Sequence, residues 1–159
     1  MFRKPLKQAS VTARQMEAGG QMCIQQPATD YSALGLRLTD AVAVLEPLMP
    51  RVRRFNATAT AGFDPGVRDA WGTYDQEAYC YGFGASCFLK LDVDGNFVKR
   101  IWFECRTQDV GNINALRKAM LAINALVPSA IADYWNDMVG AIQDSAFLDQ
   151  YFQELTRPH

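Results

Sequence analysis

The sequence predicts a single α+β domain, in which an antiparallel β-sheet of about three to five strands is packed against an N-terminal helix and three C-terminal helices. Three observations lead to this prediction. A helical pattern comes first, a strand-rich middle section with a central hairpin over residues 85–105 follows, and helical patterns fill the rest. A chain of 159 residues fits one domain and can bury a sizeable core.

Residues 1–29 are predicted to be a flexible N-terminal tail, with the single α+β domain over 30–159. From Asp30 or Ser32, either of which can cap a helix, apolar residues recur at helical spacing. Pro47 ends this pattern. The predicted buried positions of this first helix are Leu34, Leu38, Val42 and Leu45.

The stretch KLDVDGNFVKR, residues 90–100, first suggests a calcium loop. An EF-hand that began at Asp92 would need glycine at its sixth position and glutamate at its twelfth. Those positions hold Phe97 and Phe103, so the sequence excludes an EF-hand.

The same stretch predicts a hairpin. Glycine in Asp94-Gly95 accepts a positive φ without steric cost. A three-residue loop, Val93-Asp94-Gly95 with Gly95 left-handed, places the apolar side chains of both strands on one face. That face carries Cys87, Leu89, Leu91, Phe97, Ile101, Phe103 and Cys105. The opposite face carries Lys90, Arg100, Glu104 and Arg106 together with Phe88 and Trp102. Two aromatic rings on a mostly charged face are compatible with a homodimer interface or with cover by another element.

Three helices are expected after the hairpin. Asn112 can cap the first, which Pro128 ends, and Ser129 can cap the second. Asp144 or Ser145 can cap the third. The expected buried side chains are Ile113, Leu116, Met120, Ile123 and Val127 in the first, Ile131, Tyr134 or Trp135, Met138 and Ile142 in the second, and Phe147, Leu148, Tyr151, Phe152 and Leu155 in the third.

Composition excludes several classes of function. The formal net charge of −1 gives no electrostatic reason to expect nucleic acid or an anionic membrane as partner, and no apolar run approaches a membrane span. The only histidine is His159 at the end of the chain, which argues against Ser-His or Cys-His hydrolysis. No C-x-x-C pair, P-loop or complete dinucleotide fingerprint occurs, so no metal or cofactor is predicted. Without an export signal, a cytoplasmic location with reduced thiols is expected.

Two groups of residues are candidates for binding. The segment 69–81 interleaves aromatic side chains with acids, which is typical of protein interfaces, although such aromatics can also fold back onto the core. Its candidate partner-binding residues are Trp71, Tyr74, Asp75, Glu77 and Tyr79. Arg51, Arg53 and Arg100 are candidates for holding an anion, although charges on a strand can equally serve to discourage edge pairing.

The sequence therefore favours a non-catalytic protein-binding or inhibitory domain. Its specific form would be a bacterial toxin-neutralising immunity protein that occludes a basic toxin or effector domain. One alternative is a small-molecule-binding protein or small enzyme with an anion-binding pocket between sheet and helices, in which Glu104 or Tyr79 would supply acid–base groups. Another is a subunit of a larger assembly that docks through the tail.

Overall fold

In the computed structural model, the residues described are 4–8, 13–15, 22–24, 31–53, 55, 77–133 and 135–157. For 4–8, 13–15 and 22–24 the description covers the backbone alone.

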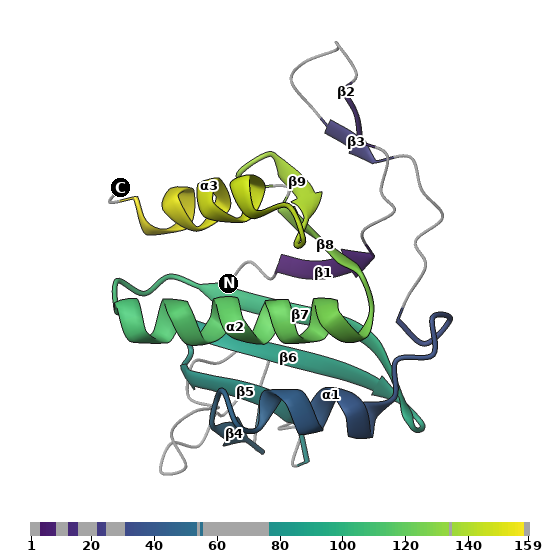
Figure 1. Cartoon of the computed structure of the whole chain (residues 1–159). Helices are drawn as coiled ribbons and strands as arrows, with labels where there is room; N and C mark the ends of the chain where they lie inside the picture. Colours follow the sequence, from purple (N-terminus) through teal and green to yellow (C-terminus); the bar gives the residue numbers. More distant parts are fainter. Residues whose placement is uncertain are drawn as a thin grey trace, which may run out of the picture.

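The fold is α+β and is built on one large antiparallel sheet (Figure 1). Seven strands follow one another in the order β4-β5-β6-β7-β1-β8-β9. Four of them, β4 to β7, form a continuous meander, which β1, β8 and β9 extend. The strands are β1 (Lys4–Gln8), β4 (Arg51–Val52), β5 (Tyr79–Gly84), β6 (Cys87–Asp94), β7 (Phe97–Cys105), β8 (Ser129–Asp133) and β9 (Met138–Ala141), and a separate two-stranded sheet joins β2 (Ala13–Gln15) to β3 (Met22–Ile24).

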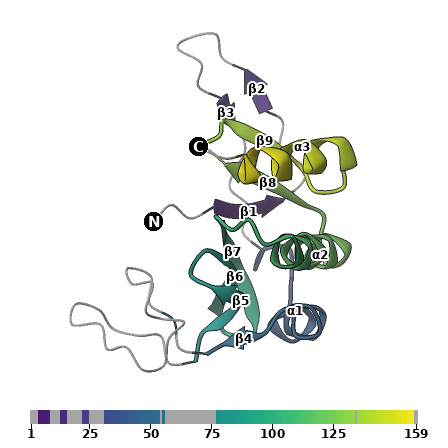
Figure 2. The same ribbon diagram turned by 90° about the vertical axis from the view of Figure 1, so that its left-hand side faces the viewer.

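The helices α1 (Leu38–Leu45), α2 (Val110–Leu126) and α3 (Ser145–Thr156) lie on the same side of the large sheet (Figure 2). The main core fills the space between them. It joins apolar side chains of the helices, such as Leu45, Leu116 and Tyr151, to those of the strands, such as Leu89 and Phe103. Full burial of each large apolar side chain contributes about 1.5–3 kcal/mol, so this layer stabilises the helix-covered face of the sheet.

The central hairpin confirms the predicted apolar face but not the predicted loop. Leu89 lies opposite Phe103 and Leu91 opposite Ile101, so the two strands do share one buried face. The connection is two residues, Gly95-Asn96, rather than three, and Gly95 is left-handed with φ +59°. The faces match because of a bulge after Asp92, where the register changes.

The bulge also corrects one member of the predicted buried set. Val98 is fully buried, whereas Phe97 is 39% exposed. The extra residue shifts the alternation between the turn and the rest of β7, so the side chains next to the turn change faces.

The prediction of a helix after Pro128, the second of the three expected C-terminal helices, is wrong. The residues after Pro128 form the hairpin β8–β9, so the described part of the chain has three helices and not the four predicted. All five residues of β8 are buried. In such a short run, periodicity alone cannot tell a strand that is buried on both faces from a segment of a buried helix. The turn signal lies in Asn136-Asp137, where Asp137 adopts φ +52°.

The predicted cap of α3 is confirmed, whereas the predicted cap of α2 is wrong. Asp144 caps α3 as predicted, because its Oδ1 accepts from the backbone N–H groups of Ala146 and Phe147. The cap of α2 is Asp109 rather than Asn112, whose own N–H donates to the Asp109 carboxylate at 2.9 Å. Pro128 follows directly after the end of this helix, as expected.

Helix α1 begins later than predicted. The backbone before it is committed to the tip of the central hairpin, since Val98 N–H donates to the Leu36 carbonyl and Leu38 N–H to the Asn96 carbonyl. Gly35 turns the chain there with φ +74°. The buried side chains of α1 are Ala41 and Leu45, and only Leu45 is among the four positions that were predicted to be buried. Leu38 packs at the margin of the core.

The range 1–29 was predicted to be a tail, and the structure differs from that prediction at Lys4–Gln8. This segment is β1, which pairs with β7 on one side and with β8 on the other. Because β1 joins the meander to β8–β9, it is part of the sheet rather than an appendage.

Candidate functional site

The predicted binding loop begins and ends at one edge of the sheet. Arg51 of β4 lies opposite Tyr81 of β5, and the backbone N–H of Ala78 donates to the Arg53 carbonyl at 2.6 Å. The chain therefore leaves after Arg53 and returns at Glu77 over a closed base. The loop residues Trp71, Tyr74 and Asp75 lie outside the described residues.

Glu77 fastens this base from outside. Its Oε2 lies 3.0 Å from Nη1 of Arg53 and 4.0 Å from Nη2 of Arg51, and its side chain is 74% exposed. An exposed ion pair contributes about 0–1 kcal/mol, so the contact orients the loop ends more than it stabilises the fold. The carboxylate predicted to face a partner is thus already matched by two arginines of its own chain.

Tyr79 folds back rather than outward. Its ring is half-buried against the main core, and the Arg51 guanidinium lies over it with Cζ 4.3 Å from the ring centre. Arg51 Nε also donates to the Ala78 carbonyl at 3.4 Å. A shallow pocket of about 360 Å³ beside this ring is lined by Glu77, Tyr79, Lys90, Leu91, Asp92 and Val93.

Arg100, the third candidate for anion binding, is separated from Arg51 and Arg53. It lies on β7, opposite Asp92 of β6, and its Nε is 3.5 Å from Oδ2 of that carboxylate. Its guanidinium also lies 5.5 Å from the Trp102 ring centre. The structure therefore brings together two of the three predicted anion-binding arginines, and each group faces a carboxylate of the chain.

Asp92 is the residue that the sequence reasoning missed as an organiser of this surface. Its carboxylate accepts from the Lys90 ammonium at 3.0 Å and from Trp102 Nε1, besides its contact with Arg100. The period of two along a strand places Lys90 and Asp92 on the same face, so that signal could have found the cluster.

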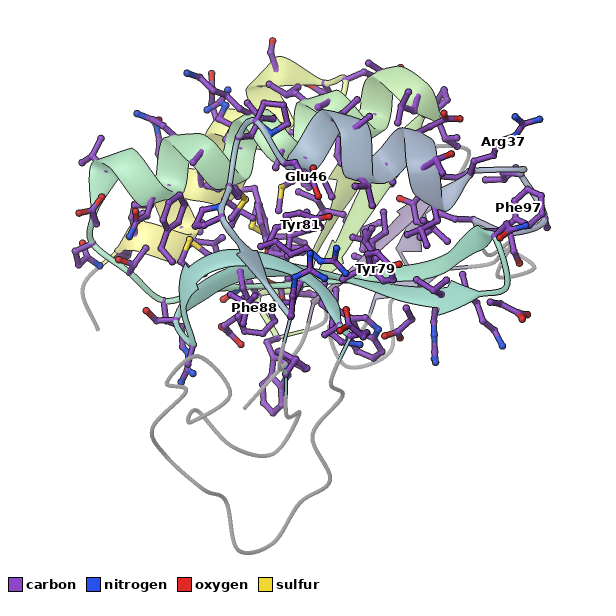
Figure 3. The ribbon with its side chains drawn as sticks, turned by 90° about the horizontal axis from the view of Figure 1, so that it is seen from below. Arg37, Glu46, Tyr79, Tyr81, Phe88 and Phe97 are labelled. Atoms are coloured by element: carbon purple, nitrogen blue, oxygen red, sulfur yellow. The ribbon has the colours of Figure 1, made fainter. Side chains whose placement is uncertain are left out.

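The opposite face of the sheet, away from the helices, also carries a buried cluster. Phe88 is fully buried against Phe55, their ring centres 5.4 Å apart, together with Cys80. Figure 3 shows Phe88 and Tyr81 on opposite sides of the sheet. Burial raises the pKa of the Cys80 thiol to about 12, although Lys90 opposes that change. Phe88 is thus part of a core, which leaves Trp102 as the half-buried aromatic of the face where a dimer seam was considered.

The predicted acid–base candidate Glu104 and the tyrosine Tyr81, which was not among the predicted candidates, differ in their surroundings. Glu104 is 2% exposed, and its Oε1 lies 3.3 Å from Nε of Arg106. The Tyr81 hydroxyl is buried and has no hydrogen-bond partner among the described residues. Burial is the main cause that raises the pKa of Tyr81 to about 12, while Arg51 lowers it and Glu46 raises it.

Cys87 and Cys105 are direct neighbours, as predicted, and both are buried free thiols. Their mutual hydrogen bond and burial raise the pKa of the Cys87 thiol, whose Sγ–H also donates to the Asn112 carbonyl at 3.7 Å. A raised pKa keeps the thiol protonated, so this pair serves packing between sheet and α2.

Within the described ranges, no cluster of three or more histidine, cysteine, aspartate or glutamate side chains is arranged to hold a metal ion. Among the described helices, none is long and apolar enough to cross a membrane. Comparison of the chain with protein-family models, with curated proteins and with solved structures found no match.

Proposed function

We propose that this chain is a non-catalytic protein-binding domain that contacts its partner through the segment 56–76, which the sequence predicts to be a surface loop in its later part. The observation that carries the proposal is the closed base of this loop, where Ala78 N–H donates to the Arg53 carbonyl and Glu77 pairs with Arg53. Binding residues are concentrated on loops that a rigid scaffold positions. Connections longer than about 12–15 residues in a compact domain are commonly functional.

The composition of the loop supports a protein partner with a basic surface. Trp71 and Tyr74 offer rigid apolar area with polar tips, and Asp75 adds a negative charge beside them. Because Glu77 is already paired with two arginines, the acidic contribution comes from the loop itself rather than from its base. A toxin-neutralising immunity protein that occludes a basic active-site mouth is the specific form that fits this chemistry.

The anion-pocket alternative has less support. Arg51 and Arg53 face Glu77, whereas Arg100 lies on another strand and faces Asp92. An anionic ligand would have to displace both carboxylates, which line the same shallow pocket.

The assembly alternative needs a different test from truncation. Removal of residues 1–29 would delete β1, which pairs on both sides inside the sheet. Loss of an assembly after truncation would then follow from a damaged sheet as readily as from a lost dock.

The proposal is tested by measuring how tightly the chain and its loop variant bind the protein partner. The partner is first identified by affinity purification of the tagged chain from its native cell with mass spectrometry. Its dissociation constant is then measured by calorimetry for the chain with Trp71, Tyr74 and Asp75 changed to alanine together. A loss of at least about 30-fold is expected, since one hot-spot residue contributes about 2 kcal/mol.

Thr39→Ala on the exposed side of α1 is the matched control, because it is distant from the loop in sequence and should leave affinity unchanged. Circular dichroism establishes that both variants are folded. Unchanged affinity in the folded loop variant would remove this surface from consideration.

A further inference from the structure

The two edges of the large sheet are built differently. Figure 2 places β4 at one end of the sheet and β9 at the other. Edge strands of soluble proteins usually carry protection against pairing, in the form of short length, charge, proline or a bulge. β4 has two residues and is bounded by Arg51 and Arg53, so it is protected by both length and charge.

β9 is also short, but it has no charge, proline or bulge. Its four residues are Met-Val-Gly-Ala, without charge or proline, and its register with β8 is continuous from Met138 to Ala141. All four residues are half-buried. An uncharged, regular edge of this kind can accept a further strand.

The hydrogen-bond alternation shows which backbone groups of β9 point outward. Ile142 N–H donates to the Ser129 carbonyl at 2.9 Å, so the pairs that bond to β8 are those of Ile142, Gly140 and Met138. The N–H and C=O groups of Val139 and Ala141 therefore point away from β8. The Ala141 carbonyl accepts from Asp144 N–H at 3.1 Å and keeps a second lone pair for another donor.

We propose that β9 is a homodimer interface, in which β9 of a second copy pairs antiparallel to it about a two-fold axis at Gly140. In that register Val139 lies opposite Ala141 of the partner subunit. The backbone N–H of each residue donates to the carbonyl of the other, and the two-fold axis generates a second, identical pair of hydrogen bonds. The strand carries no charge, so no like charges are opposed within it.

Helix α3 supplies apolar area at the same axis. Phe147 lies directly over Gly140, because a Cβ added to that glycine would come within 2.5 Å of the Phe147 ring. The ring is half-buried and stacks on Tyr151 with centres 6.0 Å apart. A second copy brings its own Phe147 beside this one, so the dimer covers the exposed part of both rings. This self-complementarity favours a second copy over an unrelated strand.

The dimer is independent of the partner-binding loop, which leaves the sheet at the opposite edge. It would hold two such loops at the far ends of one continuous sheet.

The test measures the mass of the full chain in solution by size-exclusion chromatography with light scattering across a range of concentrations. The expected mass is twice the 17.8 kDa of one chain. Val139→Lys places a charge on the edge and should give a monomer, whereas Thr39→Lys on α1 adds the same charge elsewhere and should stay dimeric. Ala141→Pro removes an outward N–H without touching the bonds to β8, and should also give a monomer.

Hydrogen exchange on the unmodified chain provides a readout that does not depend on how variants fold. The amides of Val139 and Ala141 should exchange more slowly as concentration rises. A monomer at every concentration, or a dimer that Val139→Lys leaves intact, would overturn the proposal. Amides of β9 that exchange at a rate independent of concentration would overturn it as well.

Discussion

Replacement of Asp133 by alanine should lower the free energy of unfolding by about 2–4 kcal/mol. This carboxylate is 1% exposed at the end of β8, and four hydrogen bonds reach it from described residues. Its Oδ1 accepts from the backbone N–H groups of Trp135 and Asn136, and its Oδ2 accepts from Asn136 Nδ2 at 2.8 Å and from the Tyr151 hydroxyl at 2.9 Å. It therefore fixes the β8–β9 turn and joins it to α3.

The magnitude comes mainly from Tyr151. Its hydroxyl is fully buried, so the lost partner leaves a desolvated donor that costs about 1–3 kcal/mol. Trp135 and Asn136 are exposed, so water can replace the carboxylate at their N–H groups, and those losses are smaller. Asp133→Asn should cost less than Asp133→Ala, because an amide oxygen still accepts from the turn.

The assay is urea unfolding of Asp133→Ala, Tyr151→Phe and the double variant, followed by circular dichroism. The two sites should couple by at least about 1 kcal/mol, because each change removes the same hydrogen bond. A loss below about 1 kcal/mol for Asp133→Ala, or additive effects in the double variant, would show that the Asp133–Tyr151 hydrogen bond does not stabilise the fold in this way.

Three further predictions rest on single contacts. Gly82→Ala should destabilise the chain by about 1–3 kcal/mol in urea unfolding, because the new Cβ would lie 2.5 Å from Cβ of Phe88 and 2.6 Å from the Cys87 carbonyl; a wild-type midpoint would contradict this. Tyr81 has a pKa raised to about 12 from 10.0, so its contribution to stability is full below pH 10 and is lost as pH rises toward 12. Tyr81→Phe should lose less stability than the wild type over that interval, and identical pH profiles would exclude Tyr81 as the cause. Glu77→Gln should change stability by less than about 1 kcal/mol, because its ion pair with Arg53 is exposed. It should weaken partner binding, because that ion pair orients the ends of the binding segment; thermal melting and calorimetry measure the two effects separately, and unchanged affinity would contradict the orienting role.

The central hairpin illustrates how far the sequence predicts the structure. Side-chain alternation on both strands requires Leu89 and Phe103 to share a face, and the structure has that arrangement. The same alternation cannot distinguish a three-residue loop from a two-residue loop with a bulge, because both restore the phase. Only the tertiary pairing selects the second solution.

The β8–β9 hairpin illustrates where local sequence is insufficient. Ala130 and Ala132 favour helix by intrinsic propensity, and Ile131, Met138 and Ile142 happen to fit helical spacing. Strand formation depends on a neighbour distant in sequence, since β1 pairs with β8 through residues near the start of the chain. A prediction that treats the N-terminal residues as a tail removes that neighbour and with it the reason for a strand.

The sequence predicted which residues lie at the candidate site better than it predicted what those residues contact. Arg51, Arg53 and Glu77 do lie together, but as mutual partners rather than as separate anion and protein contacts. The pairing of β4 with β5, which brings these side chains together, spans a long connection and has no local signature. Arg100 and Asp92 are likewise joined only by the cross-strand register.

The most direct test of the central claim is quantitative affinity purification of the tagged chain beside its Trp71, Tyr74 and Asp75 triple-alanine variant, at equal expression. The wild-type chain should retain one stoichiometric protein partner, and the folded variant should lose it. Equal recovery of that partner by both chains, or no partner with the wild type, would contradict it.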